Sequence, residues 1–281
     1  MKKIRLIIGV LLLSVGIGVF LYPNVREYRT SVQVDSIINH FEKTFDDSSY
    51  TGSYQALHDE MEHYNQDLAD NGQVITDAWD YEQAPVSLQN MPDKTPVIGY
   101  IQIDKIDLKM PLLLGASLKN MSEGATVMSQ TSLPIGGKST NCVIAAHRGY
   151  RGSAYFHYID QLEQGDVIRV TNPWETLSYR VTYSEVVSAT NTDVIRIQPD
   201  KDMITLISCH PYRIGGSNKQ RIVVHAERTL DEKDVSVPEK SDKISLVKDS
   251  DAVTNLESYL RYGLPVITLL LGLLLIFVKR K

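Results

Sequence analysis

The 281-residue sequence predicts a mainly β domain with a helical extension before it and an apolar segment at each end of the chain. Short runs of β-branched and apolar residues, each bounded by turn residues, recur from Pro96 onward. No helix-length periodic segment alternates with them regularly, which disfavours a parallel βαβ sheet and favours an antiparallel barrel or sandwich. The predicted strands are Val97–Ile103, Val143–Ala146, Val167–Val170, Leu177–Tyr183, Ile204–Ser208 and Arg221–Ala226.

Residues 1–23 combine a basic start with the apolar run Leu6–Tyr22. The run is close to the ~20 residues that cross a bilayer core, and the same pattern is typical of a secretory signal peptide. No A-x-A cleavage site follows the run. We therefore expect an uncleaved membrane anchor, with a cleaved signal as the alternative. Either form directs export.

Residues 24–95 are expected to form the helical extension. Apolar residues recur at helical spacing from Val25 to Phe45 and again from Tyr54 to Leu68. Asn71 followed by Gly72 is a typical end for the second helix. The β domain then occupies residues 96–230.

Residues 231–258 are rich in charged side chains and lack glycine, which predicts a solvated tether. Residues 259–281 contain a second apolar run, Leu264–Val278, followed by three basic residues. Basic residues after an apolar segment favour the cytoplasmic side of a membrane. With an uncleaved first segment, both termini are expected in the cytoplasm and the β domain on the extracellular face of the cell membrane.

The composition excludes several classes of protein. Hydrophobic residues make up 43% of the chain, charged residues 22%, and the net charge is −5. These values exclude a wholly disordered, collagen-like or coiled-coil chain, and they give no support to nucleic-acid binding. The two cysteines are too few for a disulfide scaffold and form no C-x-x-C pair.

Cys209, His147 and Arg221 are the candidate catalytic residues, because each lies at the end of a predicted strand. A thiolate is a nucleophile that a nearby imidazolium or guanidinium stabilises. A histidine can protonate a leaving amine, and an arginine can hold a developing oxyanion.

Residue type alone leaves other readings of these residues open. Cys209 could be a small buried hydrophobe, as Cys142 is expected to be, and the two cysteines could form a disulfide. His157, His210 and His225 could join His147 as metal ligands, but their spacing matches no recognised ligand pattern. We therefore expect no metal site and no cofactor.

Several segments resemble the sortase family when taken in order. Thr205-Leu206-Ile207-Ser208-Cys209 resembles the T-L-x-T-C signature of sortases, with Ser208 where threonine is usual. Ala145–Gly149 resembles the histidine segment of the family, and Arg221–Val224 resembles the strand that bears its arginine. Ser132–Gly137 and Ile101–Asp107 are similar to other family segments, so the resemblance spans roughly residues 64–228.

The subclass that the sequence resembles most is class C, the pilus-building sortases. Residues 75–81 contain Asp77 and Trp79 at the spacing of the Asp-Pro-aromatic lid of that class, with Ala78 in place of the proline. The helical extension and the C-terminal apolar segment are also similar to class C. The stretch from Cys209 to Arg221 departs from it, because it is longer than the common form and contains a rival arginine, Arg213.

The resemblance implies a closed β-barrel and a membrane-anchored cysteine transpeptidase of the Gram-positive cell surface. Cys209 would attack the Thr–Gly bond of an LPXTG-like sorting signal and form a thioester. His147 would protonate the departing amine and Arg221 would hold the oxyanion. An amine, in class C a lysine of a second pilin, would then resolve the thioester, and Asp77 and Trp79 would cover the thiol.

Two alternatives remain open at this stage. A housekeeping sortase would attach proteins to a cell-wall precursor with the same three residues. A non-catalytic, membrane-anchored adhesin or assembly factor would keep the barrel but would not need Cys209, His147 and Arg221 together.

Overall fold

The structure is a computed structural model that describes residues 2–46, 51–74, 87–92, 95–150, 153–211, 219–229 and 263–277. The chain divides into two compact units. The larger contains residues 33–150 and 154–248, and the smaller contains residues 1–32, 151–153 and 249–281. The lid-like segment 75–81 and the tether 231–258 lie outside the described residues.

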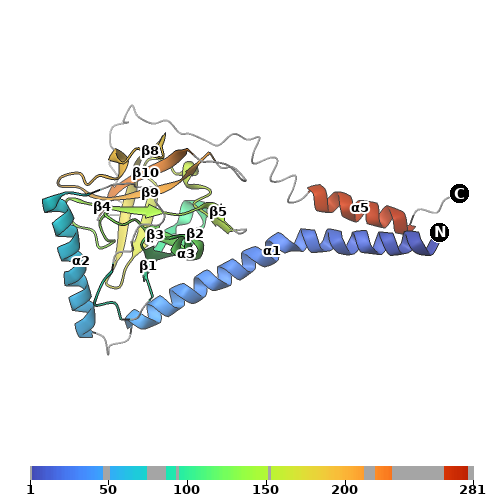
Figure 1. Ribbon diagram of the computed structural model, residues 1–281, viewed down its shortest axis with the longest axis horizontal. Coiled ribbons are helices and arrows are strands. Elements are labelled where there is room, and N and C mark those ends of the chain that lie inside the picture. Colours follow the sequence, from blue (N-terminus) through green and yellow to red (C-terminus); the bar gives the residue numbers. More distant parts are fainter. Residues whose placement is uncertain are drawn as a thin grey trace. The chain divides into compact units, whose positions relative to one another are not determined.

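Eight of the described strands close into a barrel in the order β1-β2-β3-β4-β9-β10-β8-β7 (Figure 1). A separate two-stranded sheet joins β5 (Arg148–Tyr150) and β6 (Ser153–Tyr155). The closed barrel that the family resemblance implied is confirmed, and each of the six predicted strands overlaps a barrel strand. The barrel strands are β1 (Val97–Ile103), β2 (Leu108–Leu114), β3 (Ala125–Val127), β4 (Thr140–Ala145), β7 (Val167–Thr171), β8 (Thr176–Ser188), β9 (Asp202–His210) and β10 (Gln220–Arg228).

The expectation of an antiparallel barrel or sandwich is wrong in one respect, because the barrel is mixed. The pairs β2–β3 and β4–β9 are parallel, and the other neighbouring pairs are antiparallel. The connection from β2 to β3 runs through the short helix α3 (Leu118–Glu123). A six-residue helix leaves too little periodicity for the sequence to reveal a parallel crossover.

The interior of the barrel is filled by one apolar cluster to which every barrel strand contributes. Alternate residues of each strand face it, as the period of two in a β-strand requires. In β4, β9 and β10 these residues are Cys142 and Ile144, Ile204 and Leu206, and Ile222, Val224 and Ala226.

A second, smaller apolar cluster lies on the outer face of β4, β8, β9 and β10. It contains the strand residues that alternate with those of the interior cluster, so apolar residues cover these four strands on both faces. Residues from α3 and from the loops before β4 and β9 complete it. The buried members of this outer cluster are Ala116, Met121, Met128, Val143, Ala145, Val187, Ile195, Ile207 and Val223.

Two long helices precede the barrel strands in the chain (Figure 1). The helix α2 (Thr51–Asn71) ends as predicted, with Gly72 at a φ of +80°. The buried Asn65 of α2 accepts from the amide of Leu133 at 2.7 Å and donates to its carbonyl at 3.1 Å. The structure therefore fixes α2 against the loop between β3 and β4.

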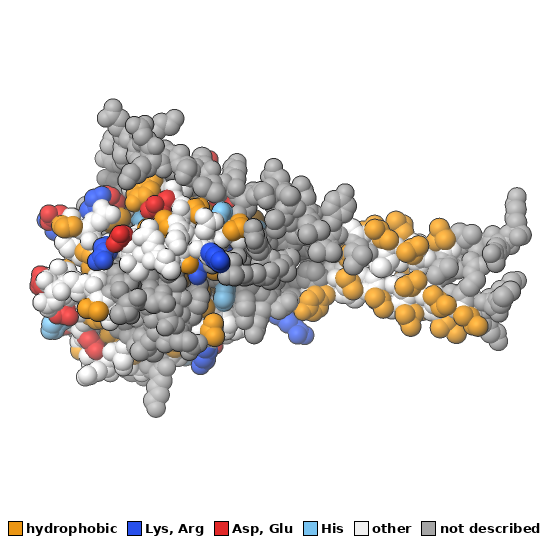
Figure 2. Space-filling model, turned by 45° about the horizontal axis from the view of Figure 1, so that its top comes forward, with side chains coloured by type: hydrophobic (Ala, Val, Ile, Leu, Met, Phe, Trp, Pro, Cys, Tyr) orange, Lys and Arg blue, Asp and Glu red, His pale blue; other side chains and the backbone are white. Residues whose placement is uncertain are grey.

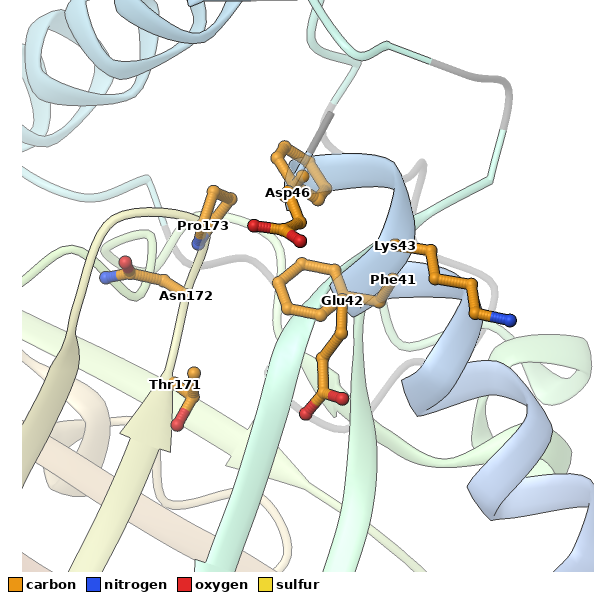
Figure 3. A pocket seen from close by; sticks show the side chains of 8 residues that line it. Phe41, Glu42, Lys43, Asp46, Thr171, Asn172 and Pro173 are labelled. Atoms are coloured by element: carbon orange, nitrogen blue, oxygen red, sulfur yellow. The ribbon is translucent and has the colours of Figure 1, made fainter. Parts of the chain in front are cut away.

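The helix α1 (Lys2–Asp46) is continuous, whereas the sequence suggested a separate apolar segment before Val25. Near its end Phe41 is buried and meets the ring of Tyr100 on β1 edge-on, with centroids 6.3 Å apart. A hollow of about 370 Å³ lies between this end of α1 and the turn from β7 to β8 (Figure 3).

In the smaller unit, the first half of α1 packs against α5 (Leu264–Phe277). Gly272 is buried there, and a Cβ atom at this position would lie 3.1 Å from the carbonyl oxygen of Gly9. Both helices expose many apolar side chains, among them Leu11 and Leu274 (Figure 2). Among the described residues, no helix meets the combined requirement of length and hydropathy for crossing a membrane.

Candidate active site

The barrel brings two of the three predicted catalytic residues, Cys209 and Arg221, side by side on β9 and β10, and β4 ends two residues before the third, His147. Arg221 of β10 pairs directly with Cys209 of β9. The parallel pairing of β4 with β9 ends with Ala145 beside Ile207, and continuing this register for two residues predicts His147 beside Cys209. Cys209 and Arg221 have the parity of the outer cluster, so their side chains belong to the same face of the sheet.

Hydrogen bonds beyond the last ladder pair hold this register. The amide of Ala146 donates to the carbonyl of Ile207 at 3.2 Å. The buried hydroxyl of Ser208 donates to the carbonyl of Ala146 at 2.8 Å. Ser208 thus ties the cysteine strand to the histidine strand, which gives a physical reason for a hydroxyl residue before Cys209.

A row of buried apolar residues, called here the apolar floor, lies next to the row of predicted catalytic residues. The next row on the same face contains Ala145, Ile207 and Val223, and all three are buried. Val187 of β8 pairs with Arg221 and extends the floor on that side. The rest of the outer cluster covers these side chains, so the floor excludes water from one side of the site.

The two cysteines differ sharply in environment. Cys142 is in the barrel interior, where burial raises the pKa of its thiol well above the usual range. Cys209 is partly exposed and belongs to the opposite face of the sheet. Both are free thiols, so the disulfide alternative is wrong. Since only a thiolate is an effective nucleophile, the environment favours Cys209 over Cys142.

The backbone and ring of His147 both have partners. Its carbonyl accepts from the amide of Phe156 at 3.0 Å, and the ring of Tyr155 lies edge-on to the imidazole with centroids 6.4 Å apart. Tyr155 has a φ of +45° and donates its hydroxyl to the carbonyl of Ser122 at 2.9 Å. A bulky residue rarely adopts this backbone conformation, so Tyr155 is held in a strained position beside the imidazole.

Burial lowers the pKa of His147 below its ordinary value. Desolvation is the cause, because the half-buried imidazolium loses part of its hydration. The neutral imidazole is therefore the main form at neutral pH, as a group that takes up a proton during a reaction needs to be.

Arg221 is buried, and one of its terminal nitrogens (Nη1) donates to the carbonyl of Gln220 at 2.9 Å. The rival Arg213 lies outside the described residues, as do the lid residues Asp77 and Trp79. Their placement stays a prediction from the sequence.

One of the histidines considered as metal ligands, His225, has other partners. His225 stacks on Tyr183 and its Nε2 is 3.2 Å from a carboxylate oxygen of Glu185. Within the described part of the chain, a single group brings three potential ligand atoms within 4.8 Å of one another, namely His58, Asp59 and Glu62 on α2. That group contains none of the predicted catalytic residues.

A partly exposed thiol, an imidazole and a guanidinium above an apolar floor define the chemistry of a cysteine acyl transferase. Comparison with known proteins agrees with this chemistry. The profile of the Sortase domain matches residues 101–229, which contain all three residues. The chain belongs to the sortase family of cysteine transpeptidases.

Relatives and solved structures place the chain within the family. It is 22% identical over 147 residues to Sortase D of Bacillus subtilis, covering 52% of this chain and 71% of that protein. It is 28% identical over 146 residues to Sortase A of Streptococcus agalactiae, covering 50% of this chain and 57% of that protein.

The crystal structure of sortase C1 from Streptococcus agalactiae is similar over 70% of this chain and 99% of that chain, with a TM-score of 0.60 and 30% identity. Sortase C from Clostridium perfringens SM101 is similar over 69% of this chain and 98% of that chain, with a TM-score of 0.56 and 29% identity. These structural neighbours are class C sortases, so the chain is most similar to that class.

Sequence reasoning missed residues that support the row. Tyr155 gave no signal, because its contact with His147 depends on a turn and an unusual φ. Arg148 and His210 directly follow His147 and Cys209 in the sequence. This adjacency did not reveal that the side chains of Arg148 and His210 contact each other.

Proposed function

We propose that this sortase cleaves an LPXTG-like sorting signal through Cys209 and joins the product to a lysine amine of a second pilin, so that surface pili grow. The observation that carries the proposal is the row of His147, Cys209 and Arg221 above the apolar floor. The likeness to class C structures supports the choice of a pilin as the acceptor.

In the first half-reaction, His147 takes the proton of the Cys209 thiol, and the sulfur attacks the threonine carbonyl carbon of the sorting signal. The carbonyl oxygen takes up negative charge, and the guanidinium of Arg221 stabilises it by hydrogen bonding. The C–N bond to glycine then breaks, His147 gives its proton to the departing amine, and a thioester remains on Cys209.

In the second half-reaction, the neutral amine of a lysine attacks the thioester carbonyl. His147 accepts the proton that the amine loses, and the Cys209 sulfur departs as thiolate. The product is an isopeptide bond between two chains, and transfer of the proton from His147 to the Cys209 thiolate returns the enzyme to its starting protonation state. Keeping water from the apolar side of the site disfavours hydrolysis of the thioester.

The substrate class is supported by a relative. Sortase C of Clostridium perfringens has been solved with the C-terminal cell wall sorting motif. That structure is 30% identical to this chain, with a TM-score of 0.57.

We also propose that the apolar ends hold the enzyme at the cell membrane with the barrel on the extracellular face. The runs Leu6–Tyr22 and Leu264–Val278 and their basic flanks support this topology. The exposed apolar side chains of α1 and α5 support it as well (Figure 2). Membrane retention would raise the effective concentration of substrates that are tethered to the same membrane. Cell fractionation tests this, because release of the full chain in the soluble fraction would contradict it.

The function is tested by incubating the enzyme with a sorting-signal peptide and a pilin fragment, followed by mass spectrometry of the products. A thioester on Cys209 and an isopeptide bond to a pilin lysine are expected, and Cys209→Ala should give neither. Transfer to a cell-wall peptide with none to pilin would instead support the housekeeping alternative. Absence of any thioester would support the non-catalytic alternative.

A further inference from the structure

The backbone pairing of β4 with β9 stops just short of the carbonyl of Cys209. Ala146 donates its amide to the carbonyl of Ile207. Carbonyls two residues apart on a strand point to the same side, so the carbonyl of Cys209 also points toward β4. The next backbone donor in that register is the amide of Arg148. At this position, however, the chain turns away to begin β5, which pairs with β6.

The side chain of Arg148 reaches this carbonyl from the start of β5. Its Nη1 lies 3.4 Å from the carbonyl oxygen of Cys209 and 3.0 Å from Nδ1 of His210. Its Nε donates to the carbonyl of His157 at 3.3 Å. The Arg148 side chain is only 2% exposed, so these contacts are made away from solvent.

A carboxylate fixes the other side of this buried guanidinium. Nη2 of Arg148 is 2.9 Å from Oδ2 of Asp160, whose side chain is 11% exposed. Asp160 lies in the short 3₁₀ helix Ile159–Gln161. This helix follows Phe156, whose amide holds the carbonyl of His147. Asp160, which holds the guanidinium of Arg148, therefore belongs to the same segment as Phe156, which holds the backbone of His147.

We propose that Arg148, held by Asp160, is a positioning residue that sets the separation between His147 and Cys209. It is covalently adjacent to His147, and its side chain bonds the backbone of Cys209. Movement of either strand end would break contacts of a buried charge, which is costly in a dry environment. The inference concerns how the two residues are aligned, and only its rate measurement depends on the proposed function.

The test is the double variant Arg148→Gln with Asp160→Asn, which removes both charges together and leaves no buried ion alone. A matched control is Arg169→Gln with Asp104→Asn. That ion pair is 2.6 Å long, and its side chains are 26% and 61% exposed. Both proteins are measured for thermal unfolding, for the pH dependence of Cys209 alkylation by iodoacetamide, and for kcat and KM with a sorting-signal peptide.

The Arg148/Asp160 variant should keep a cooperative unfolding transition but alkylate Cys209 with a changed pH dependence, because the strand ends that hold His147 and Cys209 are no longer fixed relative to each other. Its kcat should fall about tenfold or more with KM within about twofold, as expected for misplaced reacting groups. The control pair should change none of these values.

The single variant Arg148→Lys provides a milder test should the double variant not fold. A lysine keeps the positive charge beside Asp160 but lacks the branched guanidinium that also reaches Cys209. We therefore expect smaller changes of the same kind in the alkylation profile and in kcat. A folded variant with the wild-type alkylation profile and kcat would overturn the proposal. If the wild-type enzyme cleaves no sorting-signal peptide, the proposed function fails, while the alkylation profiles still decide the role of Arg148.

Discussion

Cys209 and Arg221 are direct cross-strand partners in β9 and β10. Because the carbonyl of Cys209 faces Arg148 on the β4 side, the pair with Arg221 is of the non-hydrogen-bonded kind. In such pairs the side chains approach more closely than in hydrogen-bonded ones. The register thus places a permanent cation beside the thiol without any contribution from a loop.

Replacing Arg221 by alanine should lower kcat by roughly 100- to 1,000-fold, the size seen when an oxyanion donor is lost. Arg221→Lys should recover only part of the rate, because one ammonium cannot reproduce the planar fork. Steady-state cleavage of a sorting-signal peptide measures both. A wild-type rate in Arg221→Ala together with a severe defect in Arg213→Ala would move the role to Arg213.

Alkylation of the folded protein should modify Cys209 and spare Cys142. Burial raises the pKa of the Cys142 thiol, whereas Cys209 is partly exposed. Peptide mapping by mass spectrometry after brief iodoacetamide treatment measures this. Cys209→Ala should abolish thioester formation and Cys142→Ala should not. The reverse pattern would show that Cys142 is the nucleophile.

The depressed pKa of His147 predicts how stability changes with pH. Its pKa is lower in the folded state than the ~6.5 of an unfolded chain, so the unfolded state binds more protons between these two values. The contribution of His147 to the unfolding free energy is therefore fully present above ~6.5 and declines as pH falls through that range.

Denaturant titrations of wild type and His147→Gln at a series of pH values isolate this contribution. The variant should lose less unfolding free energy than wild type between about pH 7.5 and pH 5, because glutamine does not titrate in that range. Parallel losses in the two proteins would contradict the depressed pKa.

Removing the Ser208 hydroxyl should weaken the link between β4 and β9. Ser208→Ala leaves the buried carbonyl of Ala146 without this donor and should lower the unfolding free energy by about 1–3 kcal/mol. Ser208→Thr keeps a hydroxyl and is the matched control. Urea unfolding measures both. Equal losses in the two variants would show that side-chain volume, not the hydrogen bond, is what matters at this position.

The lid remains a prediction from the sequence and has its own test. Replacing Asp77 and Trp79 by alanine should speed alkylation of Cys209, because a closed lid lowers the fraction of enzyme whose thiol is accessible. Alkylation rates of wild type and the double variant are compared under identical conditions. Equal alkylation rates in the two folded proteins would show that Asp77 and Trp79 do not cover Cys209.

The sequence allowed six of the eight barrel strands to be predicted, but not β2 and β3. It also indicated Cys209, His147 and Arg221 as candidates, because each lies at one end of an apolar run. It did not reveal that β4 and β9 are parallel neighbours, since pairing between distant segments leaves no local pattern. Nor did it distinguish Arg148 from a surface arginine. Its burial and its bond to Cys209 depend on a turn that begins only after His147. Side-chain roles of this kind arise from the tertiary fold rather than from sequence spacing.

The parallel pairing of β4 with β9 also has a consequence for how the enzyme becomes active. Ser208 and Ala146, which hydrogen-bond across these strands, are 62 residues apart in the chain. Contacts of such long range form late and slowly during folding, because a large loop must close before they add stability. A partly folded chain therefore has the thiol but not the strand that precedes its histidine. Transpeptidation should begin only after the barrel has closed.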